Sequence, residues 1–270
     1  MKWLRILFFA FLGLGAQAGY ISLSSLDWSP GGDLWLFVQE GDVYVVTPGQ
    51  ANFRRLTDEG TVEWARFGPD GEHFFYTALE GRYSVVKEGD LSGKCEVLLS
   101  EEGVNYRFPA PATDGKRLAV IAEKDGKSGI WIYNLADGTW KKVLDSPWPK
   151  ATLDFSPDGE YLAFAGLLGD SWDIFVVRIG TGDISQLTED IFFDWCPRFS
   201  PDGRWIAFAS NRAQNIDIWV MRTNGAEITP FTRDKWLDNF PAWSPDGKEI
   251  AYASRRDGED SWVIVAEGTY

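Results

Sequence analysis

A four-residue turn sequence returns at a nearly constant interval along this chain of 270 residues. Its clearest copies read "SPDG", and "SPGG", "GPDG" and "ATDG" occupy the equivalent place in the earlier copies. The six copies end at Gly32, Gly71, Gly115, Gly159, Gly203 and Gly247, so successive glycines are 39, 44, 44, 44 and 44 residues apart. A period of about 40 to 45 residues with strand-like content is typical of a propeller blade, and we therefore expect six blades.

Each of the first five copies holds the residues of four short strands, which we name A to D from the axis of the ring outward. Strand A ends at an aromatic residue, after which proline, aspartate and glycine favour a hairpin turn. Strand B alternates small residues, as in "IAFAS", and strand C is β-branched and aromatic, as in "DIWVMRT". Strand D ends in segments such as "SQLT". The sequence predicts an all-β fold, a six-bladed β-propeller of four-stranded antiparallel blades.

The sixth copy is too short for four strands, because only 23 residues follow Gly247. A blade of three strands would leave an open sheet edge. The N-terminal segment Tyr20–Leu23 precedes the first strand A, and we expect it to add the missing outer strand and close the ring.

The first 18 residues have the three parts of a secretory signal: the basic residues Lys2 and Arg5, an apolar run from Ile6 to Leu14, and the small-residue site Ala16-Gln17-Ala18. The apolar run is shorter than the ~20 residues that span a bilayer. We expect residues 1–18 to be a cleaved signal peptide and the protein to be periplasmic or secreted, with no transmembrane segment in the mature chain.

Residues 19–270 then form a single propeller domain, expected to be a monomer. Without Lys2 and Arg5, 24 basic residues face 40 acidic ones, which leaves a net charge of about −16. Nucleic acid is an unsuitable partner for such a surface. Cys95 falls in an outer strand and Cys196 at the start of an inner strand of a distant blade, so we expect two unpaired thiols.

The segments "PAWSPDGKEIAYAS" and "PRFSPDGRWIAFASNR…DIWVMRTNGAEITPFT" resemble the repeats of the TolB-type β-propeller, a WD-like family of six-bladed rings found in bacterial envelope proteins and in prolyl-oligopeptidase-type peptidases. The resemblance covers about Tyr20 to Tyr270. It implies the propeller alone, because the residues before Tyr20 are too few for the α/β domain that precedes the propeller of TolB. The G-x-S-x-G elbow of the peptidases is also missing from the sequence.

The loops that join strand D of one blade to strand A of the next combine carboxylates with large aromatic residues. We call their side of the ring the D-to-A face; the glycine turns lie on the opposite face. Exposed aromatic side chains with polar neighbours suit recognition of a peptide or a sugar. Burial of the same rings between blades is the alternative. The candidate binding residues are Trp64, Tyr106, Arg107, Trp148, Asp194, Trp195, Trp236, Asp238 and Asn239.

Carboxylates also recur at the blade period, since Asp190 and Asp234 are 44 residues apart, as are Asp194 and Asp238. Such oxygens could hold Ca²⁺ at the channel mouth. We favour the interpretation that these carboxylates are solvated or accept hydrogen bonds from the loops, and we expect no cofactor and no metal. The loops joining strands B and C carry basic residues that could pair with these acids, namely Arg82, Lys124, Arg212, Arg255 and Arg256.

Catalysis has little support in the sequence. His73 is the only histidine, and it follows the "GPDG" turn on the face away from the aromatic loops. A catalytic triad or a histidine metal centre therefore lacks a suitable residue. A glycosidase-type carboxylate pair stays open, because some of the 40 acidic residues will always lie at a suitable distance.

The sequence thus favours an exported, non-catalytic binding propeller of the bacterial cell envelope, whose partner is another envelope protein or a peptide. A glycan-binding or glycan-cleaving protein is the first alternative, because the same aromatic and acidic loops would suit a sugar. A purely structural part of a larger envelope assembly is the second.

Overall fold

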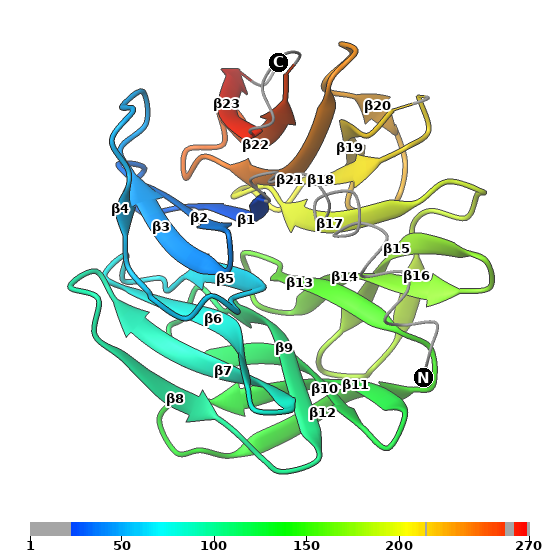
Figure 1. The fold of residues 1–270 in the computed structure, drawn as a ribbon. Coiled ribbons are helices and arrows are strands. Elements are labelled where there is room, and N and C mark those ends of the chain that lie inside the picture. The colour runs from blue at the N-terminus through cyan, green and yellow to red at the C-terminus, as the bar shows by residue number, and fades with distance from the viewer. Residues whose placement is uncertain (1–22, 214, 257–261, 269–270) are drawn as a thin grey trace.

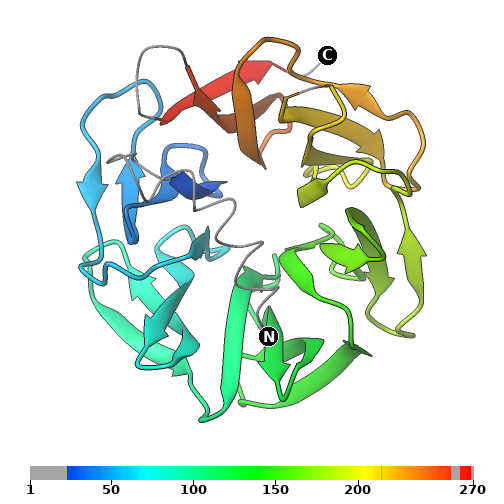
Figure 2. The same cartoon turned by 45° about the vertical axis from the view of Figure 1, so that its right-hand side comes forward.

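The computed structural model of the protein describes residues 23–213, 215–256 and 262–268. These residues form six antiparallel sheets arranged in a ring (Figure 1), and Figure 2 shows the sheets standing around a common axis. The chain travels once around this ring from blade 1 (blue) to blade 6 (orange to red). The predicted fold class, an all-β six-bladed propeller, is confirmed.

Within each blade the strands follow the chain from the axis outward. Blades 1 to 3 contain β1 (Leu23–Trp28), β2 (Trp35–Gln39), β3 (Asp42–Val46) and β4 (Arg54–Arg55); β5 (Trp64–Phe67), β6 (His73–Glu80), β7 (Tyr83–Asp90) and β8 (Cys95–Leu99); and β9 (Val104–Pro111), β10 (Arg117–Lys124), β11 (Lys127–Asn134) and β12 (Trp140–Ser146). Blades 4 to 6 contain β13 (Lys150–Phe155), β14 (Tyr161–Leu168), β15 (Ser171–Arg178) and β16 (Ile184–Gln186); β17 (Asp194–Phe199), β18 (Trp205–Ser210), β19 (Asp217–Arg222) and β20 (Thr229–Pro230); and β21 (Leu237–Trp243), β22 (Glu249–Arg255) and β23 (Trp262–Gly268).

The repeated turn joins the two innermost strands of every blade, and its hydrogen bonds explain its composition. In blade 5 the backbone N–H of Gly203 donates to the carbonyl of Ser200 (2.9 Å), and the Ser200 hydroxyl accepts from the N–H of Trp205 (3.0 Å). The Asp202 carboxylate accepts from the N–H of Arg204 (3.0 Å). Gly203 has φ of 69°, in the region that favours glycine. The turn is thus a local solution, repeated once per blade.

Small residues on the second strand let neighbouring blades pack closely. Ala163 and Ala165 of β14 are fully buried and belong to one hydrophobic cluster with Ile206 and Phe208 of β18 in the next blade. The alternating alanines of β18 and β22 are equally buried. Burial of this apolar surface, at about 25 cal/mol per Å², is the main force that holds blade against blade.

The ring closes through the same kind of packing between blade 6 and blade 1. Leu26 and Trp28 of β1 share a hydrophobic cluster with Ala242, Ala251 and Ala253 of blade 6.

The predicted closure by Tyr20–Leu23 is wrong for Leu23. This residue belongs to the innermost strand of blade 1, where it is buried and pairs with Gln39 of β2. Residues 20–22 lie outside the described residues. Among the described residues, blade 6 has three strands.

Among the described residues, no helix is long and apolar enough to cross a membrane.

Candidate functional site

Four charged side chains meet at the axis of the ring, one each from blades 1, 2, 4 and 5. Each stands one residue before the aromatic residue that ends its inner strand. Arg66 bonds Asp27 through Nε (3.1 Å) and Asp154 through Nη2 (2.8 Å). Arg198 donates to Asp27 through Nη2, and its Nε lies 3.5 Å from Asp154. We call these four residues the ionic layer.

The ionic layer is buried, with at most 9% of each side chain exposed. Backbone groups complete its bonding, because the N–H groups of Phe67 and Phe199 donate to Asp27 (2.9 Å) and Asp154 (2.7 Å). Burial by itself would raise the pKa of Asp27, but the guanidinium groups of Arg66 and Arg198 outweigh it and hold that pKa below its usual range. The layer therefore consists of fully paired ions.

Blades 3 and 6 place buried alanines, Ala110 and Ala242, at the same position of the inner strand. The order around the ring is therefore Asp, Arg, Ala, repeated twice. Sequence reasoning missed this layer, although its signal is the single residue that stands five positions before the glycine of each turn.

An aromatic layer adjoins the ionic layer along the axis. Phe108, Cys196 and Phe240 come from bulges in the inner strands of blades 3, 5 and 6, with φ of 53°, 54° and 55°. The Trp64 ring of blade 2 lies 5.6 Å from that of Phe108 and 6.3 Å from that of Phe240, between ring centroids. Such strained backbone persists only where the surrounding structure fixes it. Side chains from four blades thus pack together at the axis.

The two cysteines are free, as the sequence predicts. Cys196 is 3% exposed inside the aromatic layer, where burial raises the pKa of its thiol, whereas Cys95 on β8 is half-buried. We therefore expect native protein to react with one equivalent of a thiol reagent and to take up a second only after denaturation, without prior reduction. Absorbance titration of the thiols checks this, and no uptake by denatured protein would show that the two are bridged.

The rim of exposed aromatic residues expected on the D-to-A face does not include Trp64 or Tyr106. Trp64 is 4% exposed, and Tyr106 is 8% exposed, stacks on Trp140 (5.8 Å between centroids) and donates to Glu101 (3.3 Å). Large rings near the axis fill the space between blades because that burial is more favourable than exposure to water.

The three other aromatic candidates are half-buried. Trp148 packs on Phe175 (5.1 Å between centroids), Trp195 donates its indole N–H to Asn239 (2.9 Å), and the Trp236 ring lies 4.4 Å from the Lys235 ammonium. Asn239 is itself buried and links blades 5 and 6 through this bond.

Arg107 lies between two acids on the same face. Its guanidinium is 3.7 Å from Glu63 of the D-to-A loop between blades 1 and 2 and 4.0 Å from Glu123 of β10. These spacings are long for direct hydrogen bonds and leave Arg107 partly accessible, with 22% of its side chain exposed.

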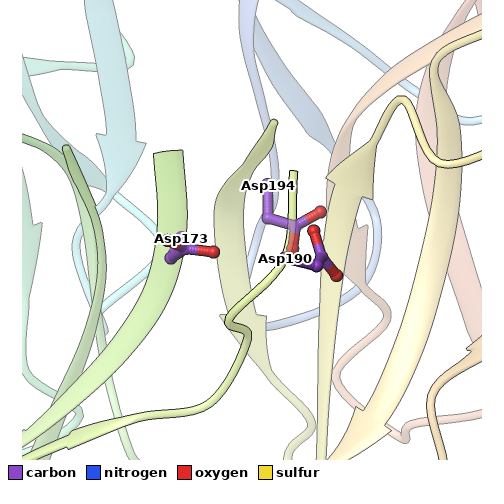
Figure 3. A group of neighbouring side chains, drawn as sticks. All are labelled: Asp173, Asp190 and Asp194. Atoms are coloured by element: carbon purple, nitrogen blue, oxygen red, sulfur yellow. The ribbon is translucent and has the colours of Figure 1, made fainter. Parts of the chain in front are cut away.

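Asp194 belongs to a cluster of three carboxylates between blades 4 and 5. Figure 3 shows Asp173 on β15, Asp190 in the loop and Asp194 at the start of β17, and one oxygen of each lies within 4.8 Å of the others. Such a group could hold a metal ion. Here Arg212 neutralises part of it, since Nη2 lies 2.6 Å from Asp194 and 3.3 Å from Asp190. Burial still raises the pKa of Asp194 despite this partner.

Arg212 also lies over aromatic rings, 5.8 Å from the centroid of Phe192, 5.3 Å from Phe208 and 5.2 Å from Trp219. Because the arginine touches both the D-to-A loop and the interior of blade 5, it fixes that loop on the blade.

Asp238 is the equivalent of Asp194 in blade 6 and is fully buried at the start of β21. Among the described residues, neither of its carboxylate oxygens has a hydrogen-bond partner. Burial raises the pKa of this carboxyl to about 6.

The most exposed large apolar residue among those described is Ile191, at 85%, on the D-to-A loop between blades 4 and 5. Leu168, 48% exposed, lies at the tip of the neighbouring hairpin, whose Ser171 hydroxyl donates to the carbonyl of Asp190 (2.9 Å). Ile191 and Leu168, together with the half-buried Phe192 and Phe193, form what we call the apolar platform. Sequence reasoning singled out Trp195 in this loop and missed the run "IFF" before it.

Comparison with known proteins matches the model of the TolB beta propeller domain to residues 90–268. The chain belongs to this family. The Tol-Pal system protein TolB of Anaeromyxobacter dehalogenans (strain 2CP-C) is 31% identical over 117 residues, which are 43% of this chain and 26% of that protein. The chain therefore matches about a quarter of this curated relative.

Solved structures agree with the TolB-type fold. TolB of Acinetobacter baumannii has a TM-score of 0.74 at 20% identity, covering 94% of this chain and 64% of that one. An oligogalacturonate lyase of Vibrio parahaemolyticus has a TM-score of 0.63 at 12% identity, covering 90% of this chain and 88% of that one. At these identities the likeness concerns the fold, and the fold alone does not decide between the functions of proteins that share it.

In this TolB-type propeller His73 lies where the sequence placed it, next to the turn on the face opposite the D-to-A loops. Its Nδ1 is 2.7 Å from the Asp70 carboxylate of that turn, and this hydrogen bond raises the pKa of the imidazole.

Proposed function

We propose that this propeller is a non-catalytic protein-binding module of the bacterial cell envelope, exported by residues 1–18, whose partner belongs to a Tol-Pal system or is a peptide segment of another envelope protein. Membership of the TolB propeller family and the name of the matching relative support this assignment. The D-to-A face over blades 4 to 6 is the proposed site, with the apolar platform at its centre.

The observation that carries the proposal is the exposure of Ile191 on a loop whose backbone is hydrogen-bonded. The N–H of Phe192 donates to the Asp190 carboxylate (2.9 Å), and that of Phe193 donates to the Asn211 side chain (2.8 Å). An apolar tip that is held in place loses little conformational entropy on binding, which is the property of an interface anchor.

Five further candidates of the sequence, of which Asn239 is buried and the others are partly exposed, extend the proposed site around the platform. Trp195, Trp236 and Asn239 lie on the same side of blades 5 and 6, and Arg107 and Trp148 lie on that of blades 3 and 4. Polar groups around an apolar centre are the usual anatomy of a protein interface.

Site-specific photo-crosslinking in the producing bacterium tests the proposal. A photoreactive amino acid at position 191 is expected to capture one predominant envelope protein. The same amino acid at position 184, on the outer strand β16 where Ile184 is 41% exposed, serves as the matched control. Equal capture from both positions would contradict a site on the platform.

The alternative, a glycan-binding or glycan-cleaving function, makes a different prediction. Oligogalacturonate, the substrate class named for one structural neighbour, should then bind to the purified protein. Envelope proteins should not compete with the sugar for this binding. We expect no heat of binding for this sugar in calorimetry, and a saturable signal would favour the glycan function.

A further inference from the structure

Two equivalent places in the ring carry the same residues in different arrangements. Asp173, Asp190, Asp194 and Arg212 line the seam between blades 4 and 5, and each has a counterpart 44 residues later. The counterparts at the seam between blades 5 and 6 are Asp217, Asp234, Asp238 and Arg256. Comparing the two seams shows what the second one lacks.

At the first seam the arginine is docked. Arg212 has only 10% of its side chain exposed and bonds Asp194 at 2.6 Å, and Asp194 is fully buried. At the second seam Arg256 is exposed, and in the part of the chain that the structure describes no ion pair joins it to Asp238. Asp238 is nevertheless as buried as Asp194, with both oxygens lacking a hydrogen bond.

A buried carboxylate without a partner is costly when it is charged, so it stays neutral until the pH is high enough to ionise it. Asp217, 1% exposed on β19, lies close enough for the two carboxyls to disfavour each other's charge. The Asp217 carboxylate accepts only a long bond from Thr232 (3.3 Å). The hydroxyls of Thr232 and Ser254 lie near Asp238 and lower its pKa, although neither makes a hydrogen bond of normal geometry to it.

The groups around Asp238 include one cation that could neutralise it. The titratable and charged groups that face it are Asp217 from β19, Asp234 from the loop, Tyr252 from β22 with Glu267 of β23 beyond it, and Arg256 after β22. Arg256 is the cation among them, and it already lowers the pKa of Asp238 from a distance.

Aromatic residues also recur at the second seam. Two of the three rings beneath Arg212, Phe192 and Phe208, have aromatic counterparts 44 residues later in Trp236 and Tyr252. A guanidinium that moved onto Asp238 would therefore meet aromatic surface, as Arg212 does.

We propose that the charge on Asp238 decides whether Arg256 docks on blade 6 as Arg212 docks on blade 5, so that this seam is a pH-sensitive switch on the D-to-A face. In acid, Asp238 is neutral and Arg256 stays in solvent. As pH rises, ionised Asp238 draws Arg256 inward over Trp236 and removes a cation from the face.

The sign of the pH dependence follows from the raised pKa values of Asp217 and Asp238, both about 6. The stability that the neutral carboxyls contribute is fully present below their unfolded pKa of about 3.9 and is lost as pH rises through about 6. Docking of Arg256 then offsets part of this loss. The switch therefore works between roughly pH 5 and pH 7.

Arginine modification with phenylglyoxal, followed by mass spectrometry of each site, tests the switch in the intact protein. Arg204 is the accessible reference, with 71% of its side chain exposed, and Arg212 is the docked reference. The ratio of Arg256 to Arg204 modification is expected to fall at least roughly fivefold between pH 5 and pH 8, because the ionised fraction of a group with pKa near 6 rises about tenfold over that range. In Asp238→Asn the ratio should stay high at every pH.

Asp194→Asn is the matched control. It should release Arg212 to the reagent and leave the pH profile of Arg256 unchanged. A flat ratio in the wild-type protein would overturn the proposal, and so would a pH-dependent ratio that persists in Asp238→Asn. The wild-type profile decides the question alone if Asp238→Asn fails to fold.

Discussion

Replacing Arg198 with methionine is expected to lower the free energy of unfolding by about 3–5 kcal/mol, the usual cost of removing one partner from a buried ion pair. Arg198 pairs with Asp27 and Asp154 in the ionic layer, and all three side chains are at most 9% exposed. Methionine would leave two buried carboxylates with Arg66 as their only guanidinium partner. Urea unfolding at pH 7.5 measures the loss.

Arg204→Met is the matched control for this variant. Arg204 pairs with Asp202 in the exposed turn of the same blade, so its loss should change stability by no more than about 0.5 kcal/mol. An Arg198→Met protein within 1 kcal/mol of wild type would show that the ionic layer contributes far less than its burial suggests.

The ionic layer also sets an acid limit to stability. The pKa of Asp27 is lowered in the folded protein, so the stability it contributes is present above its unfolded pKa of about 3.9 and is lost as pH falls through the folded value. Arg198→Met removes one of the guanidinium groups that lower this pKa. The variant should therefore unfold at a higher pH than wild type in an acid titration followed by near-UV circular dichroism.

Trp64→Ala is expected to destabilise the protein by about 3–5 kcal/mol, because it opens a cavity where four blades meet. Trp64 is 4% exposed and contacts Phe108 and Phe240. The same truncation at the half-buried Trp236 should cost clearly less, as measured by urea unfolding of both variants. A Trp64→Ala protein of wild-type stability that has lost its partner would instead restore Trp64 to the binding rim.

The architecture could be predicted because its determinants are local and repeated. Every turn ends in a glycine with positive φ, most of them also carry serine or aspartate within a few residues, and the small side chains of strand B recur at period two. These signals recur in the later copies, so the period of the sequence predicts the number of blades without knowledge of contacts between them.

The candidate site was harder to predict, because it depends on contacts between blades. Trp64 and Tyr106 look like rim residues in a loop sequence, yet their burial results from bulges and neighbours that are distant in the chain. Phe108, Cys196 and Phe240 take positive φ without being glycine, which no local pattern announces. The exposure of Ile191 could not be predicted, because the apolar run at 191–193 does not indicate which of its side chains faces solvent.

Calorimetric titration of the captured partner into wild type and Ile191→Asp tests the central claim, that the D-to-A face over blades 4 to 6 binds a protein. A charged residue at the centre of the platform should weaken binding at least roughly 30-fold, the equivalent of about 2 kcal/mol at an interface anchor. Ile184→Asp, the control on the outer strand, should bind like wild type. Equal affinities for all three proteins would place the binding site elsewhere on the ring.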